Sequence, residues 1–197
     1  MVLREKPLVL HAELTTRRTL VISDIHGDRE GFLRLLEHLQ YRPGEDTLVL
    51  LGDYVNRGPD SRGTVQAVRE LSREKNVFVL RGNNDIFLQG GPRDRLLENL
   101  NYYGDHCYFG ELLRDAGIAP PKAVEEVEDK VRQLWAAFPE ELSFLSDLPD
   151  ILDTPRFLFA HAGLESEDLD SQSLGTVLSA PGFHQNGSWI AIRDAGL

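Results

Sequence analysis

The chain has 197 residues, of which 41% are hydrophobic, and 21 basic against 32 acidic side chains give a formal net charge of −11. This length and apolar content favour a single globular domain over disorder. The acidic charge disfavours a long nucleic acid or an anionic membrane as partner. The charge does not exclude phosphorylated substrates, because bound cations can reverse the local electrostatic field.

The first six residues carry charges where a secretory signal needs an apolar stretch, and no later apolar run is long enough to span a bilayer. The single cysteine, Cys107, cannot form an internal disulfide, which fits a reducing compartment. We therefore expect a cytoplasmic protein with no membrane partner.

Taken in chain order, four short apolar runs predict buried strands at residues 20–22, 48–51, 77–80 and 157–160. Apolar residues at helical spacing separate the first three of them: Phe32, Leu35, Leu36 and Leu39, then Val65, Val68 and Leu71. Alternating strands and helices imply a largely parallel sheet with right-handed crossovers and with helices on its faces.

From about residue 92 to 150 the sequence becomes rich in charge and helical in spacing, which predicts a helical insertion within a single domain covering residues 1–197. Val124, Val127, Val131 and Leu134 form an apolar stripe that indicates helix packing rather than a partner site. After Gly163 the patterns predict only loops and short helices.

Each predicted strand ends directly in polar residues. Asp24 and His26 follow the first strand, Asp53 the second, Asn83 the third and His161 the fourth. Because ligands bind beyond the carboxyl ends of the strands in an open parallel sheet, we expect these four ends to converge on one site.

These residue types suit two divalent cations. Asp24 and His26 can grip one ion through oxygen and nitrogen, and Asp53 can bridge two ions through its two carboxylate oxygens. Asn83 and His161 would complete the second site. Mixed nitrogen and oxygen ligands suit Mn better than Ca, with Fe and Zn as alternatives.

The segments at residues 24–27, 52–58, 81–85 and 161–163 resemble, in order and spacing, those of the calcineurin-like metallophosphoesterases. The resemblance spans residues 19–163 and points to the phosphoprotein phosphatase branch, which includes bacterial serine/threonine phosphatases and diadenosine tetraphosphate hydrolases. It implies an α/β sandwich with a helical insertion, in which a metal-bound hydroxide attacks phosphorus.

The same resemblance implies roles for individual residues. Asp24, His26 and Asp53 would hold one metal, and Asp53, Asn83 and His161 the other. The candidate catalytic residues would be Arg57, which contacts the substrate phosphate, and Asn84. For Asn84 two interpretations stay open, a polarising contact to substrate and a purely structural role.

Asn56 and Asn84 depart from the family, which carries aspartate and histidine at these positions and uses them as a pair that protonates the leaving group. An asparagine amide cannot deliver a proton at neutral pH. General acid catalysis contributes about 10²- to 10⁴-fold to the rate, so we expect its loss to slow the hydrolysis of alkyl phosphates most.

The family also continues beyond a segment that Trp189 and Arg193 resemble to a Gly-His-Thr motif, whereas this sequence ends at Leu197. We expect a C-terminally shortened fold with a weaker second metal site. His184 is a candidate for the missing ligand, although the sequence does not show that it takes this role. An exposed sheet edge would favour a homo-oligomer.

The sequence thus predicts a metal-dependent phosphoesterase acting on a phosphorylated small molecule, nucleotide or phosphoprotein. The alternative is a catalytically silent metal- or phosphate-binding protein that has lost the acid-assisting pair. A nucleotide-binding α/β domain without metal is disfavoured because no Gly-x-Gly-x-x-Gly follows any strand.

Overall fold

The computed structural model describes residues 4–166, 168–180, 182–185 and 188–191, the last two ranges by their backbone alone. The strands are β1 (Val9–His11), β2 (Thr19–Ile22), β3 (Thr47–Leu50), β4 (Val77–Val79), β5 (Ile151–Asp153), β6 (Leu158–Ala160), β7 (Gly182–Gln185) and β8 (Ser188–Ala191). The α-helices are α1 (Arg29–His38), α2 (Ser61–Leu71), α3 (Arg93–Tyr103), α4 (Tyr108–Asp115), α5 (Val124–Ala137), α6 (Pro139–Asp147) and α7 (Leu174–Ser179). Three short 3-10 helices are η1 (Asn84–Gln89), η2 (Gly104–His106) and η3 (Leu169–Ser171).

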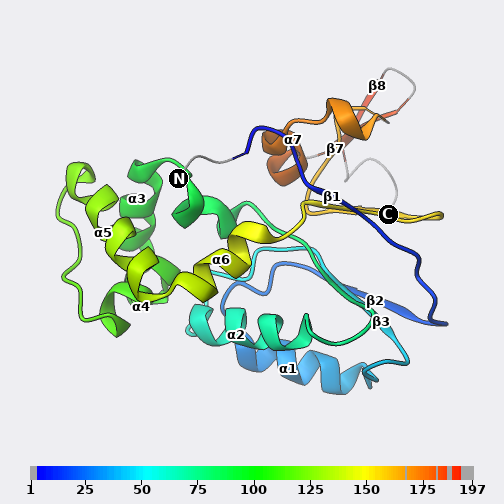
Figure 1. Cartoon of the computed structure of the whole chain (residues 1–197), viewed down its shortest axis with the longest axis horizontal. Helices are drawn as coiled ribbons and strands as arrows, with labels where there is room; N and C mark the ends of the chain where they lie inside the picture. The colour runs from blue at the N-terminus through cyan, green and yellow to red at the C-terminus, as the bar shows by residue number, and fades with distance from the viewer. Residues whose placement is uncertain (1–3, 167, 181, 186–187, 192–197) are drawn as a thin grey trace.

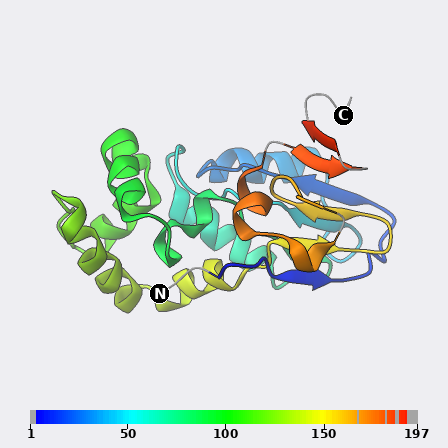
Figure 2. The same ribbon diagram turned by 90° about the horizontal axis from the view of Figure 1, so that it is seen from above.

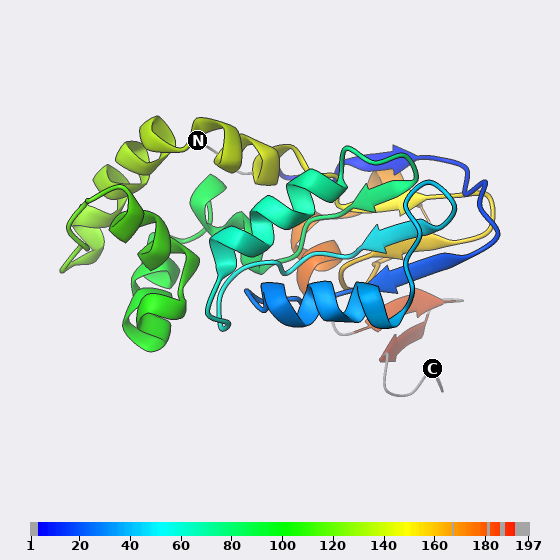
Figure 3. The same ribbon diagram turned by 90° about the horizontal axis from the view of Figure 1, so that it is seen from below.

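The strands form two three-stranded sheets and a β7–β8 hairpin. One sheet has the order β2-β3-β4 and is parallel throughout. The other has the order β1-β5-β6, with β1 parallel and β6 antiparallel to β5. Figure 1 shows the two sheets stacked, with α1 and α2 beneath the first sheet, and Figure 3 shows these helices in front of that sheet when it is viewed from below. The chain is an α/β sandwich.

The parallel sheet predicted from the alternation of strands and helices contains the first three apolar runs but not the fourth. The run at 157–160 becomes β6, which pairs antiparallel with β5 in the second sheet. The run was also predicted to be buried, but Phe157 is 54% exposed and Leu158 is 38% exposed. An apolar run indicates a strand but specifies neither its neighbour nor its exposure, and the neighbour β5 is only three residues long. The carboxyl end of β6 nevertheless points toward the same region as those of β2, β3 and β4.

Burial of β3 on both faces explains why it reads as a continuous apolar run. Leu48 and Leu50 face the large core beneath the first sheet, together with Phe32 of α1 and Val65 of α2. Val49 faces the other way and packs in a smaller cluster between the two sheets, with Leu80 and Leu152. This alternation follows from the two-residue period of a strand.

The two helices beneath the sheet begin where aspartates can cap them. Asp28 accepts a hydrogen bond from the Gly31 N–H at the start of α1, and Asp60 accepts one from the Gly63 N–H at the start of α2. Side chains of this kind satisfy N–H groups that a helix leaves without internal partners. Both helices lie where the apolar spacing predicts them.

Helices α3 to α6 gather at one end of the molecule, beside the sheets, as Figures 1 and 2 show. They occupy the region predicted to be helical, and Val127, Val131 and Leu134 of α5 are buried in the main core. This confirms helix packing for most of the apolar stripe, although Val124 at its start is 41% exposed. The division into a single domain stays a prediction.

Among the described residues, none of the helices combines the length and apolar character that a bilayer crossing requires. The cytoplasmic location and the homo-oligomer both stay predictions.

An ion pair between Arg18 and Asp46 joins the start of β2 to the start of β3. Arg18 donates to both carboxylate oxygens of Asp46 and also to the carbonyls of Leu39 and Gln40 at the end of α1. The hydrogen bonds from Arg18 lower the pKa of Asp46 from 3.8 to about 2. A depressed carboxyl pKa contributes stability above the unfolded-state pKa, and this contribution is lost as the pH falls through the folded-state value.

We therefore expect the free energy of unfolding to decline between about pH 4 and about pH 2 more steeply in the parent than in Asp46→Asn. Urea denaturation at a series of pH values, followed by circular dichroism, measures this difference. Parallel curves for the two proteins would contradict the assignment.

Candidate metal centre

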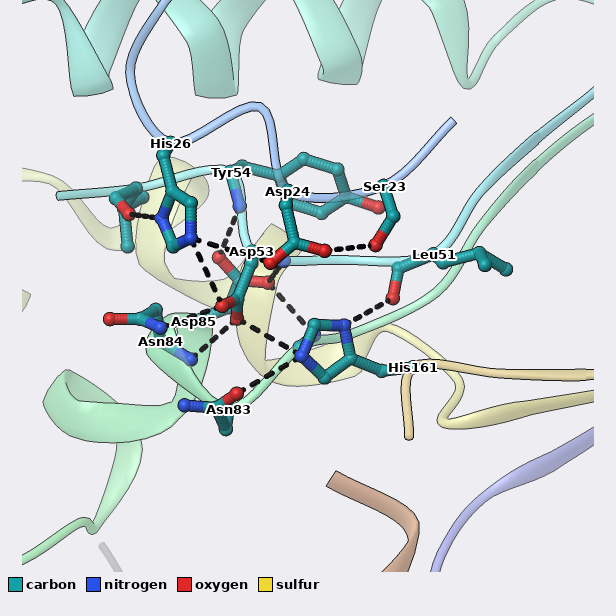
Figure 4. Close-up of polar contacts among 12 residues, drawn as sticks. Ser23, Asp24, His26, Leu51, Asp53, Tyr54, Asn83, Asn84, Asp85 and His161 are labelled. Carbon is teal, nitrogen blue, oxygen red and sulfur yellow. Dashed lines mark hydrogen bonds and ion pairs between the residues drawn. The ribbon is translucent and has the colours of Figure 1, made fainter. Parts of the chain in front are cut away.

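The polar residues that follow β2, β3, β4 and β6 come together in space (Figure 4). Asp24 and His26 lie in the loop after β2, Asp53 after β3, Asn83 after β4 and His161 after β6. One donor atom from each of Asp24, His26 and Asp53 lies within 4.8 Å of the others. The predicted ligands therefore lie side by side although they come from both sheets.

Two glycines allow the loops after β3 and β4 to approach closely. A Cβ atom on Gly52 would lie 2.2 Å from the Gly82 nitrogen, and one on Gly82 would lie 2.3 Å from the Asp53 nitrogen and from its Oδ1. Real Cβ atoms are not found at such distances from backbone atoms. Glycine is therefore required at both positions for Asp53 and Asn83 to share one site.

The loops that carry the site adopt unusual backbone conformations. Asp24, His26 and Asp53 have φ angles of 57°, 48° and 59°, and the adjacent Asn56 and Arg57 have 68° and 74°. A residue other than glycine costs on the order of 1–3 kcal/mol in such a region, so it keeps this conformation only where the surrounding structure holds it there. Such clustering is typical of functional sites.

The ring of His26 is held with an unpartnered nitrogen facing acidic oxygens. Its Nδ1 lies 3.0 Å from the carbonyl oxygen of Val55, so Nδ1–H is the donor and Nε2 of the neutral ring carries a lone pair. That Nε2 is buried and has no hydrogen-bond partner, and it lies 3.4 Å from an oxygen of Asp24 and 3.4 Å from one of Asp53. Three electron-pair donors facing one another fit a divalent cation between them.

His161 repeats this arrangement on the other side of Asp53. Its Nδ1 lies 3.1 Å from the carbonyl oxygen of Leu51, which makes Nδ1–H the donor. Its Nε2 then faces Asn83 Oδ1 at 3.0 Å and Asp53 Oδ1 at 3.6 Å. Metal-binding histidines typically donate their second ring N–H to a backbone carbonyl or carboxylate, which fixes the ring and its tautomer.

Asp53 therefore lies between two imidazole nitrogens, with Oδ2 nearer His26 and Oδ1 nearer His161. Its side chain is 3% exposed, whereas that of Asp24 is 53% exposed. The Ser23 hydroxyl donates to Asp24 Oδ2. The cluster thus combines a buried carboxylate that can bridge two ions with an outer carboxylate that solvent reaches.

Asp85 supports the site in a way that the sequence reasoning missed. Its buried carboxylate accepts hydrogen bonds from the backbone N–H groups of Asp53, Tyr54 and Gly82. Burial, and next the charge of Asp53, raise its pKa from 3.8 to about 7. Asp85 follows directly on Asn84, and this position in the motif is its only signal in the sequence.

The two asparagines that depart from the family are in contact with each other. Asn56 Nδ2–H donates to Asn84 Oδ1 at 3.2 Å, and the N–H groups of Asn84 donate to both oxygens of Asp53. Arg57 follows Asn56 in the same loop, is exposed, and has no ion pair with any acid whose side chain is described. The structure thus brings Asn84 to the cluster and leaves Arg57 at its exposed margin.

Other residues considered from the sequence lie elsewhere. Cys107 is buried, and burial raises the pKa of its thiol, which disfavours a nucleophilic role. The backbone of His184 and of Trp189 belongs to β7 and β8, but their side chains lie outside the described part of the chain, as does Arg193.

A family model described as "calcineurin-like phosphoesterase" matches residues 17–194 of the chain. The symmetrical bis(5'-nucleosyl)-tetraphosphatase of Cronobacter sakazakii is 36% identical over 86 residues, which cover 40% of this chain and 30% of that protein. The enzyme of the same name from Marinomonas sp. is 26% identical over 212 residues, covering 84% of this chain and 76% of that one.

Solved structures share the fold. A crystal structure assigned as a diadenosine tetraphosphatase superposes with a TM-score of 0.58 and 26% identity, covering 96% of this chain and 70% of that one. The cold-active protein-tyrosine phosphatase of a Shewanella species superposes with a TM-score of 0.53 at 19% identity, covering 85% of this chain and 49% of that one. The latter similarity concerns the fold alone.

Proposed function

Because the chain belongs to the calcineurin-like phosphoesterases, we propose that it hydrolyses phosphoric esters or anhydrides with the help of two divalent cations. The observation that carries this proposal is the buried Nε2 of His26, which has no hydrogen-bond partner and faces oxygens of Asp24 and Asp53. A cation held by these three groups would give the buried Nε2 the partner that it otherwise lacks.

In this proposal Asp24, His26 and Asp53 hold one cation, and Asp53, Asn83 and His161 hold the other. Mn²⁺ is our first assignment, with Fe and Zn as alternatives, because the ligands mix nitrogen and oxygen. When bound, the cations supply Lewis acidity that makes water nucleophilic at neutral pH and neutralises charge on the phosphoryl oxygens.

The protein's own residues hold the reactants. Arg57, exposed beside Asn56, offers a guanidinium fork that matches two oxygens of a phosphate group. The carbonyls of Val55 and Leu51 keep the two imidazole rings in one tautomer. Asp85, through three backbone N–H groups, keeps the Asp53 and Gly82 loops together.

We further propose that the substrate has an acidic leaving group. The pair Asn56 and Asn84 can donate hydrogen bonds but cannot protonate a departing alkoxide. A nucleotide leaving from a phosphoanhydride needs no such proton, and the relatives above are named as bis(5'-nucleosyl)-tetraphosphatases. Both observations favour a nucleotide phosphoanhydride over an alkyl phosphate such as a phosphoserine side chain.

With Mn²⁺, we expect measurable turnover of diadenosine tetraphosphate and of p-nitrophenyl phosphate, and turnover of an alkyl phosphate that is slower by at least about 10²-fold. Phosphate and nucleotide release, measured with and without EDTA, tests this expectation. Comparable rates on the alkyl and aryl esters would contradict the leaving-group argument.

A second candidate function is a catalytically silent metal- or phosphate-binding protein, which the amide pair Asn56–Asn84 favours. It predicts Mn²⁺ binding without turnover of any of these substrates. The same assay therefore separates the two functions.

A further inference from the structure

Two asparagines and a helix terminus form a continuous chain of hydrogen bonds that ends on Asp53. The backbone N–H of Tyr108, the first residue of α4, donates to Asn56 Oδ1 at 3.0 Å. Asn56 Nδ2–H donates to Asn84 Oδ1 at 3.2 Å, and Asn84 Nδ2–H donates to Asp53 Oδ2 at 2.7 Å. Helix α4 is thereby connected to the proposed bridging ligand.

The direction of this chain is determined by its two ends. Amide oxygen and nitrogen positions are assigned from the hydrogen-bond network, so an isolated pair of asparagines could be turned around. Here the Tyr108 N–H can only donate, and an ionised Asp53 carboxylate can only accept. Both amides therefore have one orientation that satisfies every member.

We propose that Asn56 and Asn84 act as a positioning relay, which holds the Asp53 carboxylate in the orientation that binds the cations. Asn84 is then a positioning residue acting through Asp53 rather than a group that contacts substrate. This proposal rests on the proposed function, because it assumes that Asp53 binds metal.

The geometry around Asp53 supports this role. Asn84 binds both oxygens of Asp53, Oδ1 through its backbone N–H at 2.8 Å and Oδ2 through its side chain. Asn56 is 3% exposed, and its own N–H is held by the Ser61 hydroxyl, so its side chain has little freedom to turn. Two Asp53 lone pairs are thereby occupied, and the remaining ones face the histidines.

An isosteric change reverses the relay without removing it. In Asn56→Asp, one carboxylate oxygen still accepts the Tyr108 N–H, but the other now requires a donor from Asn84. The Asn84 amide must turn its Nδ2 toward residue 56, which places its oxygen against Asp53 Oδ2. Asp53 loses a hydrogen bond and gains a repulsive neighbour.

The experiment measures Mn²⁺ binding by isothermal titration calorimetry at pH 8, with the spectrum of bound Mn²⁺ from electron paramagnetic resonance as a second readout. Removing an outer partner of a metal ligand typically costs about 10- to 100-fold in affinity, and we expect a loss of this size in Asn56→Asp. Asn84→Ala, which deletes the side-chain donor without adding charge, should lose affinity in the same range.

Asn99→Asp is the matched control, because Asn99 lines the same cavity as Asn56 and Asn84 but takes no part in the relay. A new negative charge near a cation should by itself raise affinity, so a purely electrostatic effect has the opposite sign. We expect Asn99→Asp to bind Mn²⁺ at least as tightly as the parent.

Parental affinity in both Asn56→Asp and Asn84→Ala, with circular dichroism showing folded proteins, would overturn the relay and leave the proposed function standing. A parent protein that binds no Mn²⁺, or binds it equally after Asp53→Asn, would overturn both.

Discussion

Replacing Asp53 by asparagine should abolish Mn²⁺-dependent turnover and lower Mn²⁺ affinity by more than about 100-fold. Outer partners of metal ligands alone account for about 10- to 100-fold, and Asp53 is proposed to bind both cations directly. Its carboxylate lies between Nε2 of His26 and Nε2 of His161, and its side chain is 3% exposed, so the substitution removes a negative charge from the buried centre of the cluster.

Thermal unfolding gives a readout of this change that does not depend on turnover. A ligand at 100 times its Kd stabilises the folded state by about 2.7 kcal/mol. For a domain of this size that corresponds to a rise in Tm of about 5–10 °C. We expect Mn²⁺ to produce this rise in the parent and none in Asp53→Asn.

Glu30→Gln serves as a control for the loss of one acidic group, since Glu30 lies on the exposed surface of α1 and pairs with Arg34 of the same helix. It should retain both turnover and the Mn²⁺-induced rise in Tm. If Asp53→Asn keeps the parent's rise in Tm, the assignment of Asp53 as a ligand is wrong.

Replacing Asp150 by alanine should destabilise the protein by about 3–5 kcal/mol, which is the typical cost of leaving one member of a buried ion pair without its partner. Asp150 is fully buried, and its Oδ1 accepts from Arg81 Nε at 2.9 Å. Its Oδ2 accepts from Arg4 and from the Leu8 N–H. Burial already lowers the pKa of Arg81, which shows how unfavourable its environment is for charge.

Guanidinium denaturation in EDTA measures this loss without interference from metal binding. Asp129→Asn is a suitable control, because Asp129 pairs with Arg132 on an exposed face of α5, and such pairs contribute about 0–1 kcal/mol. Equal losses in the two variants would show that the Arg81–Asp150 pair is not a main source of stability.

Much of the fold could be predicted because apolar runs mark strands and apolar residues at helical spacing mark helices, although Val21 and Leu158 in two of the runs are exposed. Val49 reads as apolar in a run with Leu48 and Leu50 because β3 is covered on both faces. The convergence of the strand ends on one site could be predicted because glycines and polar residues directly follow the apolar runs.

What could not be predicted depends on contacts between distant residues. The pairing of β6 with β5 depends on which strand the fold brings beside it, about which the run at 157–160 carries no information. The carbonyls of Val55 and Leu51 orient the histidines through backbone atoms that any residue possesses. The Asn56–Tyr108 hydrogen bond joins residues 52 positions apart, and no local pattern reveals it.

The contact between Gly52 and Gly82 has a consequence for engineering this scaffold. Since a Cβ on Gly52 would meet the Gly82 backbone and a Cβ on Gly82 would meet the Asp53 backbone, the loops after β3 and β4 behave as one unit under mutation. Libraries aimed at new substrates should leave both glycines constant and place their diversity on the exposed margin near Arg57. There a new side chain meets solvent rather than a neighbouring main chain.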